Sequence, residues 1–246
     1  MTIVIGSPTV ADAMTIVIER RYDGAMQAKN ESRGVTSNRR RSPARARMVR
    51  SAATLMRERG IHGVGLREIV THSGGPRGSL GRYFPGGKTQ LMTEAIDVAL
   101  AGLFDELERA LTDSETFPDA IGVIVAPWRR LLVDHDFALG CPLAATVVDA
   151  ADNDDLRDHV SELLAQWQAS VADVYAKFGD PPAIADEQST VLLAALEGAL
   201  ILARAQRSTK PLDTVERYFA SRAPDPRRQR NEAGLRSPGS RSGRAL

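Results

Sequence analysis

The sequence has few of the features that enzymes, secreted proteins or membrane proteins need. Its one cysteine, Cys141, cannot form an internal disulfide, which suits a reducing compartment. Only 5% of the 246 residues are aromatic, and no run of about 18 apolar residues occurs, so no membrane span is expected. The N-terminal MTIVIGSPTV follows no basic region and is too short for a signal peptide. We therefore expect a cytoplasmic protein without a membrane partner.

Motifs that carry chemistry are absent as well. The chain has no phosphate-binding loop, no paired-cysteine metal site and no GxSxG elbow. His135 lies six residues before Cys141 across a glycine turn, and a cysteine in an apolar run is usually buried and inert. The adjacent Asp134, His135 and Asp136 have diverging side chains and do not form a metal site. We expect no catalytic residue, no metal and no cofactor, and the chain is interpreted as a non-enzyme.

The net charge of +1 hides two regions of opposite sign. Residues 48–90 contain seven Arg or Lys and two Glu, whereas residues 91–221 contain nine basic and 23 acidic side chains. A basic module beside an acidic body would attract phosphate on one face and repel it elsewhere. The plainer alternative, that acidic helices are simply well hydrated, stays open.

Residues 65–84, GLREIVTHSGGPRGSLGRYF, have the pattern of two short helices joined by a glycine turn. Leu66, Ile69 and Val70 form one apolar face at helical spacing. The turn contains two adjacent glycines, and Pro76 is expected to begin the second helix, since it pre-sets φ for a first turn. Such a helix suits the major groove of DNA. The predicted DNA-binding residues, here and at the start of the next long helix, are Arg67, Thr71, Arg77, Ser79, Arg82, Tyr83 and Lys88.

This region resembles the DNA-binding module of the TetR/AcrR family of transcriptional regulators. The matching segments are ARARMVRSAATLMRERG, GLREIV, GGPRGSL and RYFPGGKTQL, and the PRGSL…FPGGK form with the later GCPLAA resembles a subgroup of drug- and flavonoid-responsive repressors. The resemblance covers about residues 44–220. It implies an all-α fold, with an N-terminal three-helix helix-turn-helix module followed by a helical ligand-binding and dimerisation domain. It also implies a near-palindromic DNA operator.

Glycines mark departures from the family pattern. Gly65 stands where Ser or Thr usually caps a helix, at a cost of about 0.5 kcal/mol. Gly81 replaces a tyrosine that commonly contacts phosphate in the family, and glycine weakens a helix by up to about 1 kcal/mol. Gly75 replaces a small apolar residue of the turn. Arg82 can compensate through a charge-assisted phosphate contact, so weaker DNA binding and an unusual operator both stay open.

Composition and periodicity divide the chain into four parts. These are a disordered basic N-terminal extension (1–43), a DNA-binding domain (44–90), an effector-binding and dimerisation domain (91–221) and a disordered tail (222–246). The extension repeats MTIVI and ends in Arg39–Arg41, which either form a DNA-binding arm or are simply solvated; Met14, Met26 and Met48 are alternative start sites. Further helices are expected at about 44–59, 88–111, 119–134 with a break or kink at Pro127, 142–150, 154–178, 185–207 and 212–220.

The expected helix at 185–207 is apolar on all sides, so it is either half of a homodimeric four-helix bundle or buried in its own domain. Its small residues permit close approach, and the predicted dimer interface is Ala194, Ala195, Gly198, Ala199 and Leu202. The body is expected to hold a pocket for a small hydrophobic effector. Its candidate lining residues, each of which could equally be plain core, are Trp128, Phe137, Cys141, Leu143, Val147 and Trp167.

Two hypotheses of function follow. The first is a homodimeric DNA-binding regulator, a repressor that a small hydrophobic or aromatic ligand releases from its operator. The alternative is a helical small-molecule-binding or interaction protein whose DNA-binding module has weakened, as Gly75 and Gly81 suggest. DNA binding above the charge-driven background separates the two.

Overall fold

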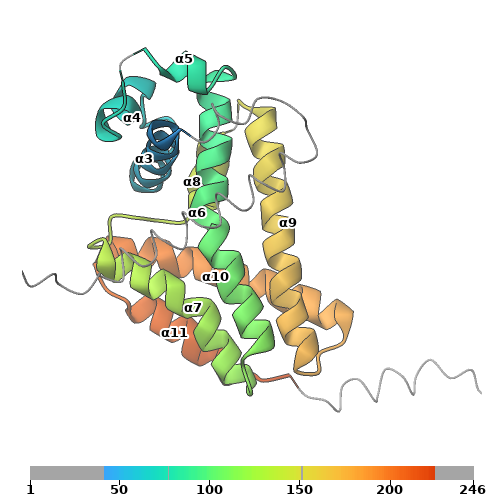
Figure 1. Cartoon of the computed structure of the whole chain (residues 1–246). Coiled ribbons are helices and arrows are strands. Elements are labelled where there is room, and N and C mark those ends of the chain that lie inside the picture. Colours follow the sequence, from blue (N-terminus) through green and yellow to red (C-terminus); the bar gives the residue numbers. More distant parts are fainter. Residues whose placement is uncertain (1–41, 77, 151, 225–246) are drawn as a thin grey trace, which may run out of the picture.

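The computed structural model describes residues 42–76, 78–150 and 152–224, and these form nine helices and no strand (Figure 1). The all-α prediction is therefore confirmed for this part of the chain. The predictions for Met1–Arg41, including the repeated MTIVI and Arg39–Arg41, lie outside the described residues, as do those for Arg77 and for residues 225–246.

Three helices form the N-terminal unit: α3 (Pro43–Arg59), α4 (Leu66–His72) and α5 (Leu80–Tyr83). The predicted apolar stripe of α3 is its buried face, where Met48, Ala52 and Met56 are 0% exposed. Gly60, at φ 74°, ends α3 as expected, since a residue without Cβ adopts this conformation at little cost. Phe84 follows α5 and is buried against the same core.

The long helix α6 (Gly87–Thr112) crosses the predicted boundary at residue 90 and so belongs to both units (Figure 1). Helix α7 (Phe117–Asp134) begins two residues before the expected start, at a capping box in which Thr116 and Asp119 each accept a bond from the other's backbone N–H. The helix continues through Pro127 without a break. The short α8 (Pro142–Asp149) then packs against α3 and α9.

The body is completed by α9 (Asp154–Lys177), α10 (Pro182–Gln206) and α11 (Lys210–Ala220). Helix α10 packs against both α9 and α11. Among the described residues, α10 is the one helix whose length and apolar composition would suffice to cross a membrane, a test that core helices also pass. Within the chain, 33% of that apolar stretch is buried.

Candidate functional site

The α4–α5 segment forms a helix-turn-helix, but its second helix is shorter than predicted. Pro76 lies in the turn, and α5 begins only at Leu80, so the expectation that Pro76 starts this helix is wrong. Gly78 has φ 81°, a conformation that a right-handed helix cannot contain, and this delays the start. Ser79 is buried, and its hydroxyl donates to the Pro76 carbonyl at 2.7 Å, so it braces the turn.

Tyr83 fastens the end of α5 to the start of α3. Its phenolic oxygen accepts hydrogen bonds from Ser42 Oγ and from the Arg82 guanidinium, each at 3.0 Å. The bond from Ser42, together with the neighbouring Arg82 charge, lowers the pKa of Tyr83. Both bonds use the oxygen as an acceptor, so the phenolic O–H stays available to a further partner.

Arg45, which the sequence interpretation missed, joins three elements of the N-terminal unit. Only 3% of its side chain is exposed. One guanidinium nitrogen lies 2.6 Å from Glu94 of α6, and Nε donates to the Tyr83 carbonyl at 3.4 Å. The guanidinium also stacks on Phe84, 4.7 Å from the ring centroid. A four-residue helix is not stable without tertiary contacts, so these contacts determine the position of α5.

The remaining predicted DNA-binding residues that the structure describes are exposed or half-buried. Arg67 and Arg82 are exposed on successive helices, and Lys88 is half-buried in the first turn of α6. Thr71 is exposed, but its hydroxyl donates to the Arg67 carbonyl at 3.0 Å. Figure 1 shows α5 beside the start of α6, at the end of the molecule away from α7 and α11. This end of the molecule is therefore accessible to the phosphate backbone of DNA.

The two unusual glycines of the motif have different surroundings. A Cβ on Gly75 would lie 2.4 Å from Met48 Cε, so the turn packs closely on α3 and a side chain there would displace the thioether. Gly81 is exposed, and no atom would lie within 4 Å of its Cβ. Gly75 is thus accounted for by packing, whereas nothing in the described structure requires glycine at 81.

Two arginines join the N-terminal unit to the body at residues 138–140. Arg57 of α3 exchanges bonds with Gly140: its Nε donates to the Gly140 carbonyl at 3.0 Å, and Gly140 N–H donates to the Arg57 carbonyl at 3.1 Å. Arg204 of α10 donates to the carbonyls of Glu58 and Ala138, at 3.2 and 2.8 Å. Burial lowers the pKa of Arg57 to about 10. Helix α10 therefore contacts α3 directly, and α6 is not the only element that connects the body to the N-terminal unit.

The predicted effector residues separate into a buried set and an exposed one. Trp128 of α7 and Trp167 of α9 are 3% and 0% exposed, and their ring centroids lie 5.6 Å apart. Cys141 and Leu143 are buried, Phe137 is half-buried, and Val147 is 49% exposed on the outside of α8. The tryptophans are brought together, whereas Val147 faces away from the core.

Cys141 lies beside Glu197 of α10, which the sequence interpretation also missed. Burial, followed by the nearby Glu197 carboxylate, raises the pKa of the Cys141 thiol well above its ordinary value. Burial likewise raises the pKa of Glu197, although its hydrogen bond with Cys141 opposes this shift. A thiol that resists ionisation is a poor nucleophile, which agrees with the inert cysteine expected from the sequence. Among the described residues no group of three or more His, Cys, Asp or Glu could hold a metal ion.

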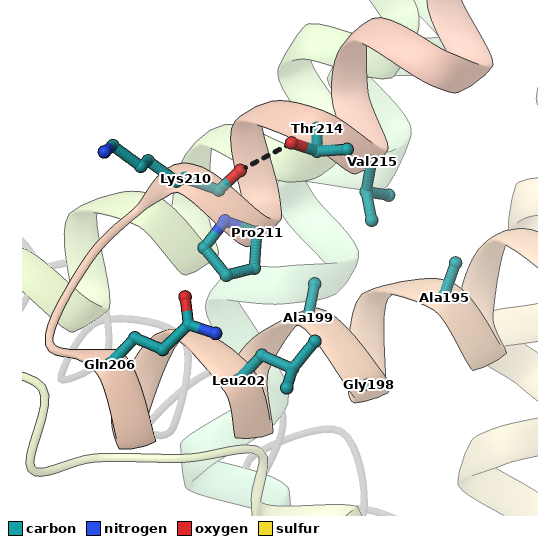
Figure 2. A pocket seen from close by; sticks show the side chains of 9 residues that line it. All are labelled: Ala195, Gly198, Ala199, Leu202, Gln206, Lys210, Pro211, Thr214 and Val215. Carbon is teal, nitrogen blue, oxygen red and sulfur yellow. Dashed lines mark hydrogen bonds between the residues drawn. The ribbon is translucent and has the colours of Figure 1, made fainter.

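A groove of about 430 Å³ lies between α10 and α11 on the surface of the body, and Figure 2 shows Leu202, Ala199 and Pro211 facing it. Four of its lining residues belong to the predicted dimer interface: Ala195, Gly198, Ala199 and Leu202. Large apolar side chains are exposed along the same two helices. They are Val191 (53%), Ile201 (66%) and Leu202 (51%) on α10, and Tyr218 (50%) on α11. We call this surface the α10–α11 face.

Comparisons with known proteins agree with this arrangement. Residues 49–95 match the family model for bacterial regulatory proteins of the tetR family, and residues 118–218 match the C-terminal domain of LmrA/YxaF-like transcriptional regulators. The HTH-type transcriptional regulator Rv0196 of Mycobacterium tuberculosis is 39% identical over 185 residues, which cover 71% of this chain and 91% of that protein. The HTH-type transcriptional regulator LmrA of Bacillus subtilis is 25% identical over 170 residues, 69% of this chain and 90% of that protein.

Solved structures share the fold. A regulatory protein TetR from Rhodobacter sphaeroides superposes with a TM-score of 0.67 at 22% identity, covering 73% of this chain and 98% of that one. A TetR transcriptional regulator from Chloroflexus aurantiacus gives 0.61 at 25% identity, covering 72% and 92%.

Proposed function

The chain belongs to the TetR family of bacterial transcriptional regulators, and on that premise we propose that it is a homodimeric repressor released from DNA by a small hydrophobic or aromatic ligand. The observation that carries the proposal is the helix-turn-helix of α4 and α5, tied by Tyr83 and Arg45 to the start of α3 and α6. It is not an enzyme, and it acts in the cytoplasm, where its operator is.

DNA contacts are assigned to the cations and hydroxyls at the α5 end of the molecule. Arg67, Arg82 and Lys88 supply charge for phosphates, and Tyr83 has a free O–H to donate to a phosphate oxygen. Arg77 keeps the DNA-binding role that the motif predicts for it. The hydroxyls of Thr71 and Ser79 already donate to backbone carbonyls, so we assign these residues to positioning the helix-turn-helix rather than to contacting DNA directly.

The α10–α11 face is assigned to the dimer. An isolated surface helix seldom exposes three large apolar side chains, and Val191 and Leu202, about three turns apart, share one face of α10. The small, exposed Ala194 and Gly198 between them let a second backbone approach closely. A twofold axis through this face would build a four-helix bundle from two copies of α10 and α11. Two copies of α5 would then read the half-sites of a near-palindromic operator.

Two structural connections can transmit a conformational change from the ligand-binding body to the DNA-binding unit. The first is α6, which runs continuously from one unit to the other. The second is Arg204, which holds both the end of α3 and the 138–140 segment from the dimerisation helix. A ligand that shifts α10 relative to α7 would therefore move α3, and with it the spacing of the two α5 helices.

A gel shift against the DNA upstream of the protein's own gene tests the proposal, at near-physiological salt with competitor DNA. We expect a discrete shift that Arg82→Ala and Tyr83→Phe each weaken by about tenfold, roughly the effect of losing one good DNA contact. Arg130→Ala is the matched control, because this exposed arginine of α7 pairs with Glu106 at 2.8 Å, far along the chain from the motif. A folded dimer that shows no shift above the nonspecific background would contradict the proposal.

Gly81→Tyr should strengthen DNA binding by roughly three- to tenfold, because it adds a phosphate-contacting side chain where space is free. Gly81→Ala is the control, since it adds the helix propensity of up to about 1 kcal/mol without the hydroxyl. Dissociation constants from fluorescence anisotropy measure both variants. Equal affinities for the two variants would mean that no phosphate lies near residue 81. If neither the natural chain nor Gly81→Tyr binds DNA, the alternative of a ligand-binding protein with a weakened module gains support.

A further inference from the structure

We propose that Arg47 of α3 is a further DNA-contacting residue, and that it shares one backbone phosphate with the Tyr83 hydroxyl of α5. The proposal rests on the proposed DNA-binding function and adds a residue that the sequence interpretation missed. Arg47 is exposed and lies in the second turn of α3, near the end of this helix that Ser42 fastens to Tyr83. A phosphate at this place would be held from two helices at once.

Most of the hydrogen-bond donors of Arg47 are unused. Its Nε donates at 3.1 Å to the carbonyl of Ser73, the residue that follows α4. Its two terminal guanidinium nitrogens have no partner within the part of the chain that the structure describes, whereas Arg45 and Arg59 of the same helix are held in ion pairs. A guanidinium has five N–H donors and stays charged, so the remaining donors of Arg47 can bind a phosphate oxygen.

The bond to Ser73 holds the Arg47 side chain in place before DNA arrives. An arginine loses side-chain entropy when binding immobilises it, and a bond that already exists in the free protein reduces this cost. Ser73 is buried in the turn between α4 and α5, so the anchor belongs to the helix-turn-helix itself. Arg47 is therefore positioned relative to both helices of the motif.

Tyr83 supplies the second group of the site. Ser42 makes no cap bond to its own helix and donates to the Tyr83 hydroxyl oxygen instead. The Arg82 guanidinium lies 4.9 Å from the Tyr83 ring centroid and donates to the same oxygen. The Ser42 bond, followed by Arg82 and then by the charge of Arg47, lowers the pKa of Tyr83. The positive charge of Arg47 therefore acts at the phenol, and an anion bound beside the phenol would be attracted by both groups.

The salt dependence of duplex binding tests Arg47 without knowledge of the operator. Phosphate contacts do not depend on sequence, so two labelled duplexes are used, one of random sequence and one from the DNA upstream of the gene. Fluorescence anisotropy with the full-length chain gives the affinity for each over a series of salt concentrations. Arg47→Ala should weaken binding to both duplexes by about tenfold. It should also reduce the slope of log affinity against log salt by about 0.9 for each chain bound.

Two further substitutions separate charge from hydrogen bonding. Arg47→Lys should keep the salt slope, because it keeps the charge. Tyr83→Phe should weaken binding and also keep the slope, because it removes a neutral group. The double variant Arg47→Ala/Tyr83→Phe should lose clearly less affinity than the product of the two single losses, because both substitutions act on one phosphate contact. Losses that multiply in full would overturn the shared site.

Arg47→Gln distinguishes a DNA contact from a brace of the turn. The glutamine amide nitrogen is as many bonds from Cα as the arginine Nε, so it can still donate to the Ser73 carbonyl without a charge. We expect it to lower the slope as Arg47→Ala does. If Arg47→Gln binds like the natural chain and no substitution at residue 47 changes the slope, Arg47 only braces the turn and the proposal is overturned. Arg130→Ala controls for net charge, since it removes an exposed arginine from α7, and should leave the slope nearly unchanged.

The two duplexes also separate this proposal from the proposed function. A natural chain that binds both duplexes equally, with a slope that still responds to Arg47→Ala, would contradict sequence-specific regulation and support the phosphate contact. A natural chain that prefers the upstream DNA, with a slope that Arg47→Ala leaves unchanged, would support regulation and overturn the contact. Binding to neither duplex at any salt concentration would overturn both.

Discussion

Leu202→Asp is expected to convert the protein from a dimer into a folded monomer. Leu202 lines the groove between α10 and α11 and is 51% exposed in the single chain, so the substitution removes little from the monomer's own core. Aspartate lowers intrinsic helix stability by roughly 0.5 kcal/mol, which a 25-residue packed helix tolerates. The main effect therefore falls on the association of two chains.

The effect on association is large because a twofold interface repeats every substitution. Burying a leucine contributes about 1.5–3 kcal/mol, and two copies lose it together. Each aspartate must also be desolvated against an apolar face, which adds a further penalty. We expect the dimer to weaken by at least about 100-fold, and operator binding to weaken with it, because one α5 then reads one half-site.

Analytical ultracentrifugation and anisotropy with operator DNA measure the two effects. Val148→Asp is the control, since Val148 is an exposed apolar residue on α8, outside the α10–α11 face, and is 79% exposed. It should remain dimeric and bind DNA. A Leu202→Asp protein that sediments as a dimer would place the interface elsewhere and leave the α10–α11 face without an assigned partner.

The helices were predictable because their determinants are local. The apolar stripe of α3 and the glycine at its end, Gly60, predict the extent of this helix. Pro181 and Pro182 predict the break between α9 and α10. The start of α5 was missed because Pro76 and Gly78 give opposing local signals, and the positive φ of Gly78 decides between them. Helix α7 begins earlier than predicted because Thr116 and Asp119 form a capping box, whose Thr-x-x-Asp spacing is a local signal for a helix start.

The candidate sites were less predictable, because buried charges depend on partners that are distant in the chain. Arg45 lies on the apolar stripe of α3, three residues before Met48, so its position was a signal, but Glu94 is 49 residues away. Glu197 is the one charge in an apolar stretch of α10, and its neighbour Cys141 comes from another element. The pairing of Trp128 with Trp167 depends on how α7 and α9 pack, which periodicity alone does not give.

Arg45→Ala should destabilise the DNA-binding unit by about 3–5 kcal/mol, the usual cost of removing one partner from a buried ion pair. The substitution leaves Glu94, which is 17% exposed, without this guanidinium, and it also removes the stacking on Phe84. Differential scanning calorimetry should show a melting temperature lowered by roughly 10 °C. Arg59→Ala, which breaks an exposed pair with Glu68 at 2.6 Å, should leave the melting temperature nearly unchanged.

DNA binding should fail in Arg45→Ala even where the protein is still folded. Helix α5 has four residues and no side-chain cap, so its position depends on the bonds from Arg45 to the Tyr83 carbonyl and from Ser42 to the Tyr83 hydroxyl. The Arg45→Ala/Glu94→Ala double variant separates the two effects. It also removes the carboxylate that has lost the Arg45 guanidinium, so it should recover part of the lost stability through a coupling of about 1–3 kcal/mol. It should not recover DNA binding, because the anchor of α5 is still absent. Additive losses of stability, or DNA binding restored in the double variant, would show that Arg45 does not hold α5 in place.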